Sequence, residues 1–193
     1  MSTINGKKIN TSNTSTKLIE QTFLPVLEDC FCPQGEIPCV VHRKIMEAYF
    51  EDIELDTPYR SRQYHVTEDE IIGFAKEWNP EPFHIDKAAA QKSKIGKIFA
   101  CGPHIIAICT KLTNERRPRP ATVAGLGWDE LRFTTPVFHD DRLWVEITAK
   151  SKRRSNSNPG VGIVVYTLRV LNQMEQEVLT YTVSTMVECR LKG

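Results

Sequence analysis

The chain has 193 residues and a net charge of +1, from 25 Lys and Arg against 24 Asp and Glu, and 40% of its residues are hydrophobic. A chain of this size and composition predicts one globular domain with a core of its own. The balanced charge argues against a nucleic-acid partner held by a general positive field. No apolar run approaches the roughly 20 residues of a membrane helix, so no membrane partner is expected.

The six cysteines lack the dense, even spacing of a secreted disulfide scaffold, and the polar N-terminus lacks the apolar segment of a secretory signal. We therefore expect reduced thiols and a cytoplasmic protein. The cluster Cys30, Cys32, Cys39 and His42 does not have the spacing of a zinc finger, so the sequence predicts no metal and no cofactor.

Residues 1–48 are predicted to form an N-terminal arm. The first 17 residues are rich in Ser, Thr, Asn and Lys and bury almost nothing, which is typical of disorder. Apolar residues at helical spacing over 18–27 predict a short helix. The domain proper is expected over 49–193.

Three helices are expected in the first half of this domain. Thr67 and Glu70 form a capping-box pattern before an apolar face that stops at Pro80. A run of alanines predicts a second helix over 86–93. The third, over 103–115, is apolar nearly all round and is therefore expected at the centre of the domain.

The second half of the domain changes to the alternating pattern of half-buried strands, as in LWVEITA at 143–149. One or two further strands are expected within 50–66, and turn residues at 158–160 and 172–175 separate the later strands. Because the strands largely follow one apolar helix, the pattern predicts an α+β fold. The four long strands are expected over 122–135, 142–153, 161–172 and 177–189.

Two motifs, FAKEWNPEPFHID at 74–86 and IGKIFACGPHIIAI at 95–108, resemble the MaoC-like dehydratase family, which contains (R)-specific enoyl-CoA hydratases. The resemblance covers about 49–190 and includes GWDELRFTTPV at 127–137. It implies a single hotdog fold, in which a curled antiparallel sheet wraps around a central apolar helix. It also implies a homodimer or a dimer of dimers that binds acyl thioesters of coenzyme A or acyl carrier protein.

The implied reaction is the reversible addition of water to a trans-2-enoyl thioester in fatty acid metabolism. Family members carry an Asp five residues before a catalytic His; here His84 matches the His, and Asn79 stands at the Asp position. An amide cannot take up a proton as a carboxylate can.

Three interpretations of this substitution stay open. His84 acts alone while Asn79 orients water or the imidazole; or Glu77, Glu81 or Asp86 replaces the missing acid. In the third, the protein binds acyl thioesters without turnover, or supports an active partner subunit. A thioesterase is a further alternative from fold analogy.

The family resemblance also implies that Gly102 donates its backbone N–H to the thioester carbonyl at the start of the central helix. The alternative is a glycine that only permits a tight turn. Pro82, Phe83, Cys101 and His104 are expected to contact substrate, although His104 could instead pack at a dimer interface.

Basic side chains on and beside the strands are candidates for the phosphates of coenzyme A, because guanidinium groups match phosphate geometry. Ordinary solvated strand charges are the equally plausible alternative. The residues concerned are Arg132, Lys150, Lys152, Arg153 and Arg154.

Overall fold

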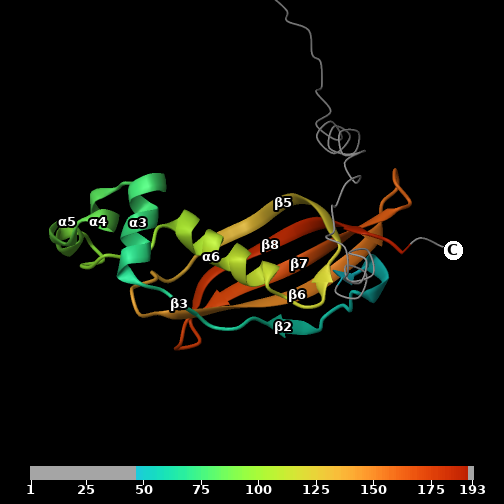
Figure 1. Ribbon diagram of the computed structural model, residues 1–193, viewed down its shortest axis with the longest axis horizontal. Coiled ribbons are helices and arrows are strands. Elements are labelled where there is room, and N and C mark those ends of the chain that lie inside the picture. The colour runs from blue at the N-terminus through green and yellow to red at the C-terminus, as the bar shows by residue number, and fades with distance from the viewer. Residues whose placement is uncertain (1–46, 191–193) are drawn as a thin grey trace, which may run out of the picture. The chain divides into compact units, whose positions relative to one another are not determined.

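The computed structural model describes residues 47–190. These residues form an antiparallel sheet, one long central helix and a group of shorter helices (Figure 1). In chain order the elements are β1 (Glu47–Ala48), the 3-10 helix η1 (Phe50–Asp52), β2 (Pro58–Arg60), β3 (Tyr64–His65), α3 (Glu68–Trp78), α4 (Pro82–Ile85), α5 (Lys87–Lys92), α6 (Gly102–Asn114), β4 (Arg119–Pro120), β5 (Thr122–Phe133), β6 (Arg142–Arg154), β7 (Val161–Leu171) and β8 (Glu177–Glu188).

The sheet has the strand order β2-β6-β7-β8-β5, and β3 pairs separately with β6. All of these pairings are antiparallel, and the four predicted long strands are confirmed with ends shifted by at most two residues. The predicted turn after β7 is also present. Its Asn172 side chain accepts hydrogen bonds from the N–H groups of Met174 and Gln176, which closes the hairpin to β8.

Helix α6 lies against the sheet, with Ile105, Ile108, Cys109 and Leu112 buried in the main core. Burial of each large aliphatic side chain contributes about 1.5–3 kcal/mol, so this face fixes the helix on the sheet. The predicted hotdog arrangement, a curled antiparallel sheet around an apolar helix, is confirmed.

Helices α3, α4 and α5 lie together at one end of α6 (Figure 1). The Thr67 side chain caps α3 by accepting the Glu70 N–H, and Asp86 caps α5 by accepting the Ala89 N–H at 2.6 Å. Both helices were predicted, with ends within a residue or two. The predicted capping box is only half formed: the Glu70 carboxylate does not bond back to the Thr67 N–H, because it accepts the Tyr64 hydroxyl instead.

Strand β5 forms one edge of the sheet, and its outer side pairs with no strand of residues 47–190. Three large apolar side chains of this strand are exposed: Val123, Trp128 and Phe133. Edge strands of this kind are a template for pairing with another chain. The β5 edge is therefore free to pair with a further strand.

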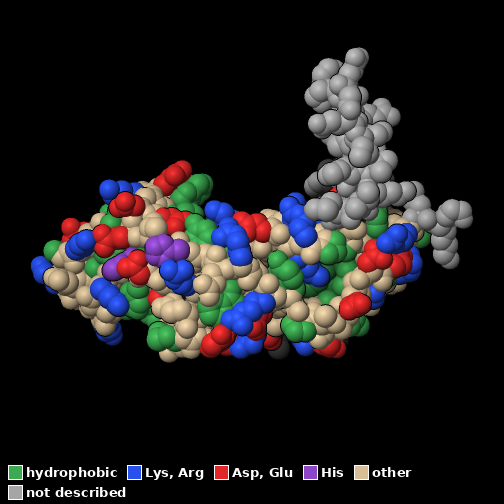
Figure 2. Space-filling model, turned by 60° about the horizontal axis from the view of Figure 1, so that its bottom comes forward, with side chains coloured by type: hydrophobic (Ala, Val, Ile, Leu, Met, Phe, Trp, Pro, Cys, Tyr) green, Lys and Arg blue, Asp and Glu red, His purple; other side chains and the backbone are tan. Residues whose placement is uncertain are grey.

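Charges of both signs are interspersed on the face shown in Figure 2, in keeping with the near-neutral composition. In the described part of the chain, no helix is long and apolar enough to cross a membrane. Cys101, Cys109 and Cys189 are buried free thiols. The predicted N-terminal arm to residue 46, including Cys30, Cys32, Cys39 and His42, lies outside the described residues.

Candidate functional site

His84 lies in the short helix α4 and is only 4% exposed. Its ring meets the rings of Phe83 and Phe99 edge-on, with centroid distances of 4.6 and 4.5 Å. The Nδ1 atom lies 2.9 Å from the Phe99 carbonyl oxygen. Because a carbonyl can only accept, Nδ1 carries the hydrogen and donates it, which leaves Nε2 as the basic nitrogen of the neutral ring.

The Nε2 atom of His84 is open. It makes no hydrogen bond to any residue between 47 and 190, and it is not among the polar atoms of that segment that are sealed from solvent. A buried ring with one nitrogen fixed and the other accessible is the arrangement that a general base requires.

Asn79 ends α3, because the proline that follows it disfavours helical backbone at the preceding residue. Its N–H donates to the Ala75 carbonyl at 2.9 Å, and its own carbonyl accepts the Glu81 N–H at 2.8 Å. The half-buried side-chain amide makes no hydrogen bond to another described residue. The loop thus carries both Asn79 and His84 without a hydrogen bond between their side chains.

Gly102 is the first residue of α6, and the ring of Phe133 lies directly on it. A Cβ atom at this position would come within 2.8 Å of the Phe133 ring. Gly102 does not have a positive φ, so the close approach of this ring, rather than a tight turn, is what favours glycine; a Cβ would displace the end of the Phe133 side chain.

The N–H group of Gly102 has no partner within the helix, as is general for a first helical residue, and no other described residue accepts it. It stands at the positive end of the helix dipole. This free donor is suited to an oxygen that gains negative charge.

Three further predicted contact residues lie within two positions of His84 or Gly102 in the chain. Cys101 is the buried N-cap of α6, and its backbone carbonyl accepts the His104 N–H at 3.0 Å. Phe83 is half-buried and lies parallel to Phe99 at 5.8 Å, whereas Pro82 begins α4 and is exposed.

The three carboxylates considered as replacements for the missing acid do not reach His84. Glu77 and Glu81 are exposed, and neither bonds to His84. Asp86 is occupied as the cap of α5. Among the described residues, the His84 side chain therefore has no carboxylate partner.

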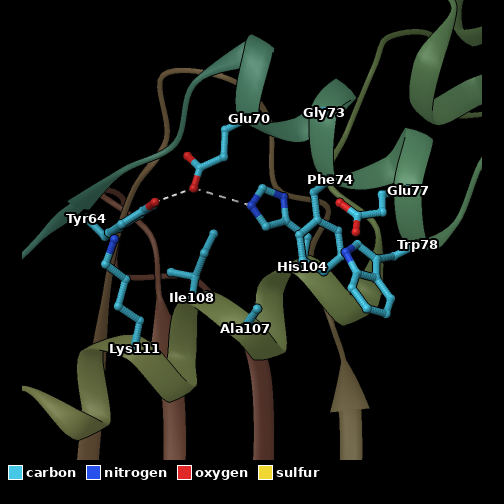
Figure 3. A pocket seen from close by; sticks show the side chains of 10 residues that line it. All are labelled: Tyr64, Glu70, Gly73, Phe74, Glu77, Trp78, His104, Ala107, Ile108 and Lys111. Carbon is cyan, nitrogen blue, oxygen red and sulfur yellow. Dashed lines mark hydrogen bonds and ion pairs between the residues drawn. The ribbon is translucent and has the colours of Figure 1, made fainter.

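His104 does not lie with His84 but lines a separate cleft between α3 and α6, with a volume of about 350 Å³ (Figure 3). The Tyr64 hydroxyl donates to Glu70, and His104 Nε2 faces the same Glu70 oxygen at 3.6 Å. Sequence reasoning missed this cluster; a histidine within the apolar central helix was its only signal. The lining residues are Tyr64, Glu70, Gly73, Phe74, Glu77, Trp78, His104, Ala107, Ile108 and Lys111.

Burial dominates the electrostatics of this cleft. It lowers the pKa of His104, with the nearby Glu70 carboxylate opposing the shift. Burial, together with the hydrogen bond to Glu70, raises the pKa of Tyr64 to about 12. Both groups are therefore held neutral near pH 7, and neither is poised to exchange protons there.

Most of the predicted phosphate-binding side chains are engaged within the chain. Lys150 pairs with Asp56 at 2.9 Å, Arg154 pairs with Glu51 at 2.6 Å, and Lys152 donates to three backbone carbonyls. Arg132, next to Phe133 on β5, donates only to the Leu131 carbonyl. It is the basic side chain closest in sequence to the ring that covers Gly102.

Comparisons with known proteins identify the family and the fold. The family model described as a MaoC like domain matches residues 51–170. An uncharacterised protein of Bacillus subtilis, YdeM, is 28% identical over 141 residues, which are 72% of this chain and 97% of YdeM.

Solved structures give the same result. A MaoC-like dehydratase from Rhodospirillum rubrum is 32% identical with a TM-score of 0.71, over 75% of this chain and 99% of that one. The R-hydratase PhaJ1 from Pseudomonas aeruginosa, in its unliganded form, is 25% identical with a TM-score of 0.62, over 74% of this chain and 86% of that one. The chain belongs to the MaoC-like dehydratase domain family.

Proposed function

We propose that the protein adds water reversibly to the double bond of a trans-2-enoyl thioester, giving the 3-hydroxyacyl thioester. The observation that carries this proposal is the His84 ring, held through Nδ1 by the Phe99 carbonyl and open at Nε2. Membership of the MaoC-like family and the likeness to an R-hydratase support the reaction class. Coenzyme A and acyl carrier protein are the two carriers to be tested.

The proposed steps use one base. Nε2 of His84 removes a proton from water as the water oxygen bonds to C3 of the substrate. The electrons of the double bond move onto the thioester oxygen, which forms an enolate. The imidazolium then returns the proton to C2, and the enolate collapses to the thioester carbonyl. One water is consumed, and His84 ends in its starting state.

Two further groups assist in the proposed mechanism. The free Gly102 N–H donates to the thioester oxygen as its negative charge grows, at a helix start where the dipole adds to the effect. Asn79 orients the attacking water through its unpaired side-chain amide. Neither group takes up a proton, so neither replaces the imidazole.

A second candidate function is thioester binding without turnover, alone or as a supporting subunit. The observation that favours it is the absence of any carboxylate beside His84 within residues 47–190, where the family carries an Asp at the position of Asn79. Such a protein would bind an enoyl thioester and leave it unchanged.

We further propose that the protein is a homodimer that pairs through the β5 edge. Trp128 is 52% exposed, and Phe133, which lies on Gly102, is 48% exposed. Covering this strand would bury both side chains and bring the second copy beside the start of α6. Arg132 on the same strand is then the group we assign to a carrier phosphate.

The test is hydration of trans-2-butenoyl-CoA by the purified chain, followed by loss of the enoyl absorbance, beside His84→Ala. Release of free thiol is measured in the same reactions to detect a thioesterase. We expect hydration by the native protein, loss of it in His84→Ala and no thiol release. Full activity in His84→Ala would refute the mechanism, and binding without hydration would establish the second candidate.

A further inference from the structure

The proposed site is divided between two helices. Helix α3 leads into the loop that carries Asn79 and His84, and helix α6 begins at Gly102. The base and the N–H donor must hold a fixed separation, since a displacement of about 1 Å can cost a hundredfold in rate. Contacts between α3 and α6 therefore bear directly on the chemistry.

One side chain of α6, His104, is at the centre of these contacts and is only 2% exposed. Its ring stacks on Phe74 of α3, with centroids 4.7 Å apart and planes inclined by 13°. Phe74 in turn meets Trp78 at 6.3 Å, and Trp78 directly precedes Asn79. A row of ring contacts thus leads from His104 of α6 through Phe74 to Trp78, the last residue of α3 (Figure 3).

A polar contact joins the same two helices. His104 Nε2 faces a carboxylate oxygen of Glu70, and that oxygen also accepts the Tyr64 hydroxyl of β3. Apolar packing alone tolerates rotation and sliding of one helix on another, whereas a shared polar partner has a preferred direction. The Glu70 carboxylate of α3 is thus hydrogen-bonded to β3 and lies 3.6 Å from His104 Nε2 of α6, a contact longer than a hydrogen bond.

One atom of the His104 ring works against folding. Its Nδ1 atom is sealed from solvent and has no hydrogen-bond partner in the described part of the chain. A buried polar atom without a partner opposes folding. A leucine of similar volume would avoid that penalty but would lose the stack on Phe74 and the contact with Glu70.

We propose that His104 is a positioning residue, which fixes α3 and the loop from Asn79 to His84 against the start of α6 through Phe74 and Glu70. This inference rests on the proposed function for its effect on rate, but its structural claim is separate. His104 acts without touching substrate, in contrast to the contact role that the family resemblance suggested. The other charged groups of the cleft are Glu77 of α3 and Lys111 of α6.

The experiment compares His104→Leu with His104→Gln in the full chain. Leucine keeps the bulk and removes the N–H donor, whereas glutamine keeps a planar group with a donor for Glu70. Lys111→Ala is the matched control: Lys111 lines the same cleft on the same helix, but its ammonium lies over the Tyr64 ring, 4.9 Å from the centroid. Each variant is measured for kcat, KM, melting temperature and amide hydrogen exchange of residues 79–85.

For His104→Leu we expect roughly a tenfold loss of kcat with KM nearly unchanged. The melting temperature should be equal or higher, while the loop amides exchange about tenfold faster. His104→Gln and Lys111→Ala should behave as the native protein. Unchanged loop exchange in His104→Leu, or equal impairment of the Gln variant, would overturn the inference. If the native protein hydrates nothing, the proposed function fails, and loop exchange alone decides whether His104 positions the loop.

Discussion

His84 and His104 are both almost completely buried beside aromatic rings, yet their surroundings differ at the level of single nitrogen atoms. In His84 the sealed side of the ring is satisfied by the Phe99 carbonyl, and Nε2 is open. In His104 the sealed Nδ1 has no partner among the described residues, and Nε2 faces Glu70. The partners of the two ring nitrogens, rather than the extent of burial, therefore separate the proposed base from the proposed positioning group.

The elements that carry the two residues reinforce this difference. His84 lies in a helix of four residues that begins at Pro82 and is followed directly by the short helix α5. His104 lies in the first turn of the 13-residue α6, whose buried face is fixed on the sheet. A short helix can present a side chain to a substrate, whereas a side chain on the central helix can hold neighbouring elements in place.

Replacing the open histidine gives the largest expected effect. His84→Ala should lower kcat/KM for hydration about a thousandfold, because it removes the proposed acid and base at once. The measurement is steady-state hydration of trans-2-butenoyl-CoA, with His104→Leu as its counterpart. An equal decrease of kcat/KM in His84→Ala and His104→Leu would contradict the assignment of different roles to the two histidines.

The donor at the start of α6 is tested by Gly102→Pro. Proline is tolerated at a first helical position but has no N–H, and Cys101 already has the extended backbone that a residue before proline prefers. Gly102→Ala is the control, because it adds the same Cβ under Phe133 and keeps the N–H. We expect kcat for the Pro variant to be about a hundredfold below that of the Ala variant. Equal rates would exclude the Gly102 N–H from the reaction.

Asn79→Asp sharpens the comparison by giving His84 the carboxylate that the family carries. The rate of hydration should rise about tenfold, because a second group then shares the proton transfers. His104→Leu in this background should still reduce the rate by the same factor as in the native protein. A native protein that is inert beside an active Asn79→Asp variant would identify the chain as a thioester binder.

The smallest effect concerns stability and pH. Burial lowers the pKa of His104 in the folded protein below its ordinary value of 6.5, so the unfolded chain binds this proton more readily. The free energy of unfolding therefore has its full value above pH 6.5, where His104 is neutral in both states. It decreases as the pH falls from 6.5 through the folded-state pKa of His104. Urea unfolding at a series of pH values should show this loss in the native protein and not in His104→Leu. Parallel curves would contradict the burial argument.

The fold was largely predictable from the sequence. Alternating side chains defined β6, β7 and β8, and capping residues defined α3 and α5 within a residue or two. Helix α4 was not predicted, because its four residues, Pro82–Ile85, are too few to carry a periodic signal. The paired strands β1 and β4, of two residues each, are too short for any pattern.

The site was predictable only in part. His84 and Gly102 came from the family resemblance, but the free nitrogen of His84 depends on the Phe99 carbonyl, 15 residues away in sequence. Glu70 was interpreted as half of a capping box, since its bond to Tyr64 joins a strand to a helix. Contacts of this kind depend on tertiary packing, which local sequence patterns do not report.

The most direct test of the central claim, that one imidazole carries out both proton transfers, is the stereochemistry of hydration in heavy water. In the proposed mechanism a single imidazole serves both C3 and C2, so the new hydroxyl at C3 and the deuterium at C2 should be added to the same face. NMR of the 3-hydroxyacyl product determines their relative configuration. Addition to a single face would support His84 as the sole acid and base, whereas deuterium on the opposite face would require a second proton donor and contradict the account.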